Sequence, residues 1–179
     1  MRVITGSARG AKLKTLEGLA TRPTSDRVKE AIFNIIQFDI QGRRVLDLFG
    51  GSGQLAIEAL SRGADYAVIV DQSAEAVKVI KDNLKKTKFD QQASVFQMDY
   101  LRYLSTAREK FDLIFLDPPY AEKSLENALQ KISEIDILSE GGIIICERPK
   151  DKVMPPEVGG LLCSRDYNYG KTAVNLYTR

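Results

Sequence analysis

Apolar runs alternate with helically spaced segments along most of this chain. Five short runs have the length and composition of strands, at 44–48, 66–70, 94–97, 111–116 and 142–146. Three segments between them space apolar side chains three and four residues apart, as amphipathic helices do, at 54–61, 74–84 and 125–135. Strands that alternate with helices predict an α/β fold with a parallel sheet, right-handed crossovers and helices on both faces.

The beginning of the chain departs from this alternation. Segments 3–5 and 12–15 flank the turn-forming sequence Gly-Ser-Ala-Arg-Gly-Ala, which predicts a small hairpin. Pro23, Thr24 and Ser25 then predict the start of a helix that ends before Gly42. The apolar stripe of this helix consists of Val28, Ile32, Ile35 and Ile36.

The last part of the chain also departs from the alternation. Segments 161–166 and 172–177 flank Asn168-Tyr169-Gly170 and predict a closing antiparallel hairpin. We therefore expect an N-terminal hairpin-plus-helix extension over residues 1–42 and a sheet domain over residues 43–179. Segment 151–160 matches no pattern that assigns it a role.

Composition excludes several kinds of chemistry. The 179 residues include no histidine and only two cysteines, Cys146 and Cys163, which form no CxxC pair. Histidine-based nucleophiles and general bases are therefore excluded, and we expect no metal site. There is no apolar run of membrane-spanning length and no leader-like N-terminus, so we expect a cytoplasmic protein, most simply a monomer.

Charge is distributed unevenly along the chain. The first 44 residues carry nine Lys and Arg residues against four Asp and Glu residues, and the remainder carries 17 against 20. A basic head on a mildly acidic body favours a polyanion partner, with an ordinary solvated surface as the alternative. The candidate contacts are Arg9, Lys12, Lys14 and Arg22.

A glycine-rich loop follows the first predicted strand, in the sequence Asp47-Leu48-Phe49-Gly50-Gly51-Ser52-Gly53. Such a loop before a helix N-terminus forms the ligand crevice of a doubly wound sheet. The spacing of Gly51, Gly53 and Ala56 also satisfies a dinucleotide fingerprint, so a nicotinamide or flavin enzyme is one interpretation. Asp47 favours another, because a carboxylate repels a pyrophosphate but attracts the ammonium and sulfonium groups of S-adenosylmethionine.

Acidic residues also end the second and third predicted strands. Asp71 follows the glycines by 18 residues, where a carboxylate accepts hydrogen bonds from ribose hydroxyls. Asp99 can accept a hydrogen bond from an adenine amino group, or it can simply cap the next helix.

The fourth predicted strand runs directly into Asp117-Pro118-Pro119-Tyr120. Two prolines end the strand and stiffen the turn, which fixes the Asp117 carboxylate and the Pro118 carbonyl in place. Two acceptors and a stacking ring at Tyr120 suit a planar base with an exocyclic amine. Acceptors on the amine hydrogens expose the nitrogen lone pair, and this chemistry needs no strong base.

These motifs resemble a known family. Asp117-Pro118-Pro119-Tyr120 is similar to the box of amino-methyltransferases that act on nucleic-acid bases. The remaining motifs resemble the bacterial 16S rRNA guanine-N2 methyltransferases in particular. They are Arg2–Gly6 with Arg9-Gly10, Arg22–Asn34, Gly50–Gly53, Ile57–Ala64 and the closing Tyr167-x-Tyr169-Gly170-x-Thr172. The resemblance covers nearly the whole chain, with Gly50 in place of the alanine usual in the family.

The resemblance implies a Rossmann-like fold and an S-adenosylmethionine-dependent enzyme that methylates the N2 amine of one guanine in 16S rRNA, either in free RNA or within an assembling small subunit. It implies Asp117, Pro118 and Tyr120 at the target base. The expected cofactor set is Thr24, Asp47, Phe49, Gly50, Gly51, Gly53, Asp71, Gln72 and Asp99. Two alternatives are an adenine-N6 or cytosine-N4 methyltransferase, for which the chain has no room for a large target-recognition region, and a catalytically silent RNA-binding protein.

Overall fold

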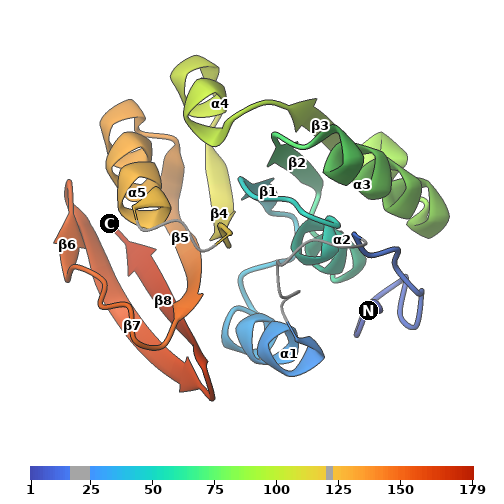
Figure 1. Cartoon of the computed structure of the whole chain (residues 1–179), viewed down its shortest axis with the longest axis horizontal. Coiled ribbons are helices and arrows are strands. Elements are labelled where there is room, and N and C mark those ends of the chain that lie inside the picture. The colour runs from blue at the N-terminus through green and yellow to red at the C-terminus, as the bar shows by residue number, and fades with distance from the viewer. Residues whose placement is uncertain (17–24, 120–122) are drawn as a thin grey trace.

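A single mixed sheet of eight strands organises the computed structural model, which describes residues 1–16, 25–119 and 123–179. The strand order is β3-β2-β1-β4-β5-β8-β7-β6 (Figure 1). The parallel half consists of β1 (Arg44–Asp47), β2 (Tyr66–Asp71), β3 (Ala93–Gln97), β4 (Phe111–Leu116) and β5 (Leu138–Pro149). The antiparallel half consists of β6 (Glu157–Val158), β7 (Leu161–Tyr169) and β8 (Thr172–Thr178).

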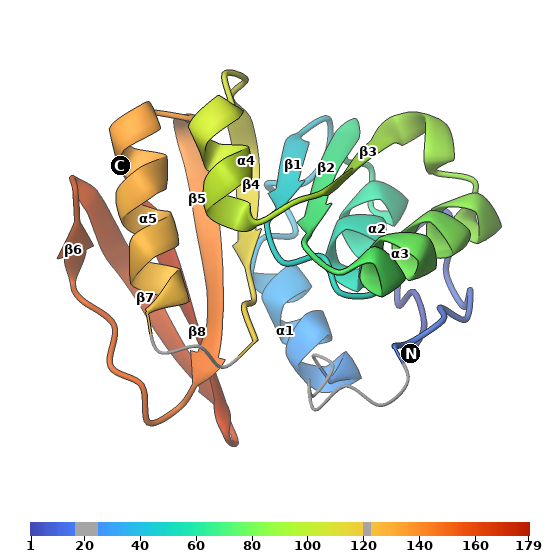
Figure 2. The same ribbon diagram turned by 45° about the horizontal axis from the view of Figure 1, so that its top comes forward.

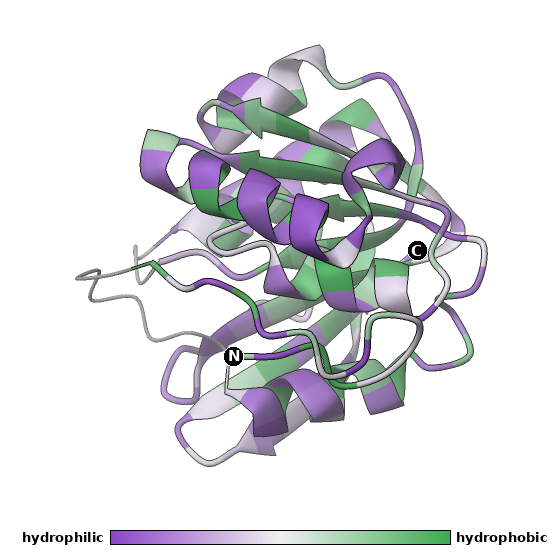
Figure 3. Ribbon diagram, turned by 90° about the vertical axis from the view of Figure 1, so that its right-hand side faces the viewer, coloured by the Kyte–Doolittle hydropathy of each residue, from purple (hydrophilic) through white to green (hydrophobic). Residues whose placement is uncertain are grey.

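Helices cover both faces of this sheet. One apolar cluster contains side chains of α1 (Asp26–Ile35), α2 (Gln54–Ser61) and α3 (Ala74–Thr87). The cluster on the other face contains side chains of α4 (Tyr100–Thr106) and α5 (Ser124–Ile135). Figures 1 and 2 show α1 and α5 on opposite sides of β4 and β5. The strands between the layers are mostly hydrophobic, whereas the outer faces of the helices are hydrophilic (Figure 3).

The α/β class, the parallel sheet and the closing hairpin are confirmed, and the predicted strands and helices match the observed ones to within a few residues at most boundaries. Three elements were missed: α4, the two-residue strand β6, and a short 3₁₀ turn at Asp90–Gln92. β5 is also longer than the predicted 142–146 run, because its ends extend beyond the apolar residues to pair with β4 and β8.

The N-terminal hairpin is shorter than predicted. The chain does reverse there, and the backbone N–H groups of Val3 and Gly10 donate to Ala11 and Val3. Only one bridge, between Arg2 and Lys12, has strand geometry, so the two segments form no regular strands. Their apolar residues Val3 and Leu13 are buried in the same cluster as α1 and α2. The division between residues 42 and 43 stays a prediction.

A buried ion pair anchors this head to the sheet domain. The Lys29 ammonium of α1 lies 3.7 Å from the Glu58 carboxylate of α2, and both side chains are fully buried. Glu58 also accepts hydrogen bonds from the backbone N–H groups of Ile4 and Thr5, at 2.8 and 3.0 Å. Lys29 donates to the Arg2 carbonyl at 2.6 Å. Burial lowers the pKa of Lys29, although the Glu58 charge opposes this shift.

A buried amide makes a second connection between head and domain. The Asn83 side chain on α3 is fully buried and accepts from the Lys14 N–H at 2.7 Å. Its NH₂ group donates to the carbonyls of Lys14 and Ser52, at 3.0 and 2.9 Å. One side chain therefore fixes both the head and the glycine loop, because its amide satisfies backbone groups of each.

Candidate functional site

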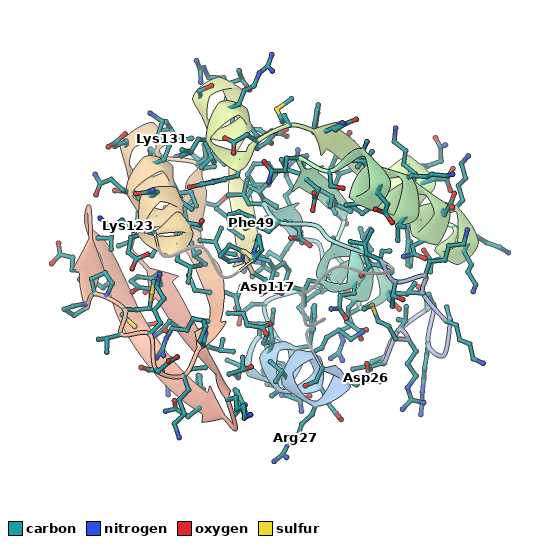
Figure 4. The ribbon with its side chains drawn as sticks, viewed as in Figure 1. Asp26, Arg27, Phe49, Asp117, Lys123 and Lys131 are labelled. Atoms are coloured by element: carbon teal, nitrogen blue, oxygen red, sulfur yellow. The ribbon has the colours of Figure 1, made fainter. Side chains whose placement is uncertain are left out.

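A cavity of about 450 Å³ opens at the carboxyl ends of the parallel strands. In a doubly wound sheet this edge, where the strand order reverses between β1 and β4, is the expected ligand position. The cavity receives residues from the loops after β1, β2, β3 and β4, from the end of β5 and from the head. Figure 4 places the labelled Phe49 and Asp117 near the centre of the molecule, where both line this cavity.

The glycine loop forms one wall of the cavity. Gly51 has a left-handed backbone (φ +56°), and an added Cβ there would meet no other atom within 4 Å. Gly53, which was also predicted to bind the cofactor, is left-handed (φ +79°) and is the N-cap of α2, but it is not among the residues that line the cavity. A Cβ at Gly50 would lie 2.5 Å from the Ile69 Cγ2. The loop therefore turns tightly and brings its backbone close to the cavity.

Asp47 is the most buried carboxylate of the cavity, with a relative exposure of 1%. Burial is the main cause that raises the pKa of Asp47 to about 7, and the charge of Asp117 contributes to the same shift. Opposing this, Asp47 accepts a hydrogen bond from the Phe49 N–H, at 3.4 Å. A buried carboxylate beside a second one favours a cationic ligand and disfavours a phosphate. These two carboxylates therefore fit the ammonium and sulfonium groups of S-adenosylmethionine and do not fit a pyrophosphate.

Asp71 is half-buried at the end of β2 and already has two backbone partners. One carboxylate oxygen accepts from the Gly51 N–H at 2.9 Å, and the other accepts from the Ser73 N–H at 2.9 Å. These bonds hold the carboxylate rigidly between the glycine loop and the start of α3. Each oxygen has a further lone pair, so a ribose hydroxyl can still donate to it. The adjacent Gln72 also lines the cavity.

Asp99 lines the cavity at the end of β3 and caps α4. One of its oxygens accepts from the N–H groups of Leu101 and Arg102, at 2.9 and 3.2 Å. The capping alternative is therefore what the structure contains, and a contact with a cofactor stays a prediction. Beside it, the rings of Phe49 and Tyr100 lie 4.9 Å apart between centroids and both line the cavity.

The turn after β4 places Asp117, Pro118 and Pro119 on the cavity wall. Tyr120 falls outside the described residues, as do Thr24 and Arg22, so their predicted roles have no structural account. Of the other predicted polyanion contacts, Arg9 and Lys12 are exposed on the head. Lys14 is exposed as well, but its ammonium lies 2.8 Å from the Asp82 carboxylate.

Several lining residues were not predicted. Met1, Thr15 and Leu16 reach the cavity from the head, and only tertiary packing brings them there. Glu147 lines the cavity at the end of β5. Its signal was present in the sequence, because an acid directly follows the fifth apolar run, as Asp71 and Asp117 follow theirs.

The described residues contain neither a three-ligand metal cluster nor a helix that could span a membrane. Among residues 1–16, 25–119 and 123–179, no cluster of three His, Cys, Asp or Glu side chains has a geometry that holds a metal ion. No helix in these same ranges has both the length and the apolar character that crossing a bilayer requires.

Comparison with known proteins gives matches over the full length. The model of the family described as "Conserved hypothetical protein 95" matches residues 1–178. The chain is 44% identical to "Putative rRNA methyltransferase YlbH" of Bacillus subtilis (strain 168), over 100% of this chain and 99% of that protein. It is 35% identical to "Ribosomal RNA small subunit methyltransferase D" of Haemophilus influenzae, over 99% and 93%.

Solved structures match as well. "Putative methyltransferase yhhF from Escherichia coli" superposes with a TM-score of 0.90 at 28% identity, over 100% of this chain and 97% of that chain. An RNA methyltransferase from Salinibacter ruber, solved in complex with S-adenosyl-L-homocysteine, superposes with a TM-score of 0.65 at 17% identity, over 88% and 93%. The second similarity shows a shared fold.

Proposed function

This chain belongs to the family described as Conserved hypothetical protein 95, and on that premise we propose that it transfers a methyl group from S-adenosylmethionine to the N2 amine of a guanine in 16S ribosomal RNA. The names of the two sequence relatives support ribosomal RNA as the substrate, and one of them specifies the small subunit. The choice of the guanine amine rests on the resemblance of the other motifs, such as Arg22–Asn34 and Ile57–Ala64, because the Asp117-Pro118-Pro119-Tyr120 box indicates only an exocyclic amine.

One observation carries the proposal: a buried carboxylate and an Asp-Pro-Pro turn share one cavity. Asp47 and Asp117 are close enough for the charge of Asp117 to raise the pKa of Asp47. A cation bound between them relieves this repulsion. The cofactor and the target amine would therefore meet where the two strands β1 and β4 end side by side.

The residues around the cavity divide the work of binding the cofactor. Asp47 would neutralise its positive charge, and Asp71 would accept from its ribose. The Phe49–Tyr100 pair offers an aromatic wall beside Asp99 for the adenine ring. When bound, S-adenosylmethionine would supply a methyl group on a cationic sulfur. The sulfur would keep the electron pair of the broken C–S bond, and the amine nitrogen would gain the methyl group and release a proton to water.

Asp117 and the Pro118 carbonyl would hold the amine through its two hydrogens. An exocyclic amine is a poor nucleophile, because its lone pair is delocalised into the ring. Two fixed acceptors turn that lone pair toward the methyl group, and they act most strongly as positive charge develops on the nitrogen. The base must leave its stack to reach the cavity, which costs a few kcal/mol and favours a guanine in a loop.

The head would supply much of the affinity for RNA. Arg9 and Lys12 are exposed near the tip of the chain reversal, and the head adjoins the cavity through Thr15 and Leu16. Phosphates held at the head would therefore lie within a short span of a base in the cavity.

Mapping of methylated nucleotides tests the proposal. Small-subunit RNA from cells that lack the gene should lose one N2-methylguanine, and the purified protein with S-adenosylmethionine should restore it. Methylation at adenine N6 or cytosine N4 would overturn the assignment to guanine. RNA binding without any methylation would identify a silent RNA-binding protein.

Single-turnover kinetics then test the role of Asp117. Asp117→Ala should reduce the rate about 10²–10³-fold, the usual effect of removing one transition-state acceptor or donor, and should change the cofactor affinity far less than that. Asp90→Ala is the matched control, because Asp90 is exposed on the 3₁₀ turn and does not line the cavity. Near-normal turnover by Asp117→Ala would contradict the assigned role.

A further inference from the structure

Glu147 lies level with Asp117, near the carboxyl end of the neighbouring strand β5, which ends at Pro149. In the parallel ladder between β4 and β5, Phe115 pairs with Ile145 and Leu116 pairs with Cys146. The next position along each strand is occupied by Asp117 and by Glu147. Both residues line the cavity. Neighbouring strands are about 4.8 Å apart, so the two side chains can reach adjacent atoms of one ligand.

The two carboxylates also share a face of the sheet. Phe115 and Ile145 belong to the apolar cluster beneath α1 and α2, whereas Leu116 and Cys146 belong to the opposite cluster. Side chains alternate along a strand, so residues two positions beyond Phe115 and Ile145 lie on the face of α1. Asp47 pairs with Phe115 in the ladder between β1 and β4, which places it on this face as well.

The neighbouring Arg148 also lines the cavity, but its guanidinium is bound to other partners. It is buried on the opposite face, where its guanidinium donates to Asn175 at 2.5 Å and to both oxygens of Asp166 at 2.9 Å. Its donors are therefore occupied within the sheet. Beyond Asp117, the cavity lining therefore includes the carboxylate of Glu147, whereas the guanidinium of Arg148 is held by Asn175 and Asp166.

An acceptor beside the amine-binding position distinguishes the bases. In guanine, the N2 amine adjoins the N1–H group, so both positions are donors. In adenine and cytosine, the exocyclic amine adjoins a ring nitrogen that is an acceptor. An ionised carboxylate can only accept hydrogen bonds, so it pairs with the guanine edge and repels the other two.

The geometry points to Glu147 as the specificity-determining residue, which accepts a hydrogen bond from N1–H of the guanine whose N2 amine is held by Asp117 and Pro118. This inference rests on the proposed function and extends it, because it assigns the choice of base to one side chain. The methyl-transfer step itself is unchanged, since Glu147 contacts a ring atom that does not react.

A base analogue tests this inference. 2-Aminopurine keeps the C2 amine of guanine but has an acceptor at N1 in place of the N1–H group. Small subunits are reconstituted with RNA that carries either guanine or 2-aminopurine at the mapped position, and kcat/KM is measured for each. The wild-type protein should prefer guanine by roughly 10–100-fold, the usual effect of leaving a polar group unpaired.

Glu147→Gln should reduce this preference several-fold or more, because an amide can present either its oxygen or its NH₂ group to the base. Glu140→Gln is the matched control, since Glu140 is exposed on the same strand and does not line the cavity. It should keep the full preference, and all three proteins should bind S-adenosylhomocysteine equally in calorimetry.

Two results would overturn the inference while leaving the proposed function intact. One is equal methylation of guanine and 2-aminopurine by the wild-type protein, a comparison that needs no variant. The other is a Glu147→Gln protein that loses activity on both substrates by the same factor. If the wild-type protein methylates no guanine at all, the proposed function is wrong, and the inference that rests on it is wrong as well.

Discussion

The affinity for a cationic cofactor should depend on pH through Asp47. Its carboxyl group is buried and has a pKa of about 7, so a substantial fraction is protonated near neutrality. A sulfonium or ammonium group binds the ionised form, and the protonated form must first lose its proton. The observed association constant is therefore the constant of the ionised form multiplied by the fraction of protein that is ionised.

The size of this effect follows from the pKa. With a value of about 7, lowering the pH from 8 to 6 reduces the ionised fraction about tenfold, which corresponds to about 1.4 kcal/mol of binding free energy. Calorimetry with S-adenosylmethionine at several pH values measures this slope directly. Asp47→Asn should bind more weakly at pH 8 and should show a much flatter dependence.

The same group should have the opposite effect on the stability of the free protein. The pKa of Asp47 is raised in the folded state, so between about pH 4 and 7 the unfolded chain binds fewer protons and stability falls as the pH rises. Asp47→Asn removes this cost, which has an upper bound of about 4 kcal/mol at pH 8. The variant should therefore melt at a higher temperature at pH 8 while binding less cofactor.

This combination separates a ligand-binding Asp47 from a structural one. A carboxylate that served the fold alone would lower the melting temperature when replaced and would leave cofactor affinity unaffected. A wild-type affinity that stays constant between pH 6 and 8, together with equal binding by Asp47→Asn, would refute the reasoning.

Three further predictions concern the head. Lys29→Met should destabilise the protein by at most about 3–5 kcal/mol in urea unfolding, because the buried Glu58 loses one charged partner and keeps only Arg62, at 2.9 Å, and adding Glu58→Gln should recover part of this loss; an unchanged midpoint for Lys29→Met would contradict the account. Asn83→Ala should lower stability by roughly 1–3 kcal/mol and weaken cofactor binding as the Ser52 loop loosens; normal binding by a destabilised variant would limit Asn83 to the fold. Neutralising Arg9 and Lys12 together should flatten the salt dependence of RNA binding, measured by filter retention, and an unchanged slope would place the phosphate contacts elsewhere.

The strands that position the cavity could be predicted from the sequence. Strands buried on both faces appear as continuous apolar runs, and the acids at Asp47, Asp71 and Asp117 mark where these runs end. The same rule applies to Glu147, the acid that directly follows the run 142–146. α4 was missed because its seven residues are too few to display a helical period.

The contacts that join the head to the sheet domain could not be predicted. Lys29 is a charged residue in a helix with an expected apolar stripe, and its partner Glu58 lies 29 positions away on another helix. Pattern methods compare near neighbours, whereas this ion pair and the Asn83 bridge join segments that meet only after the sheet has formed. Propensity therefore locates the elements, and specific polar contacts decide how they are joined.

The position of β8 has a consequence for folding during synthesis. β8 follows β7 in the chain, yet it lies between β5 and β7 in the sheet. Until β8 has left the ribosome, β5 keeps an unpaired edge of apolar residues, and β7 has no strand through which to join the parallel half. Since Thr172 at the start of β8 lines the cavity, the site is completed by one of the last strands to emerge. Slow translation of segment 150–178 would prolong the time for which this edge of β5 is exposed in the nascent chain. Chaperones would have their main opportunity to bind at that stage.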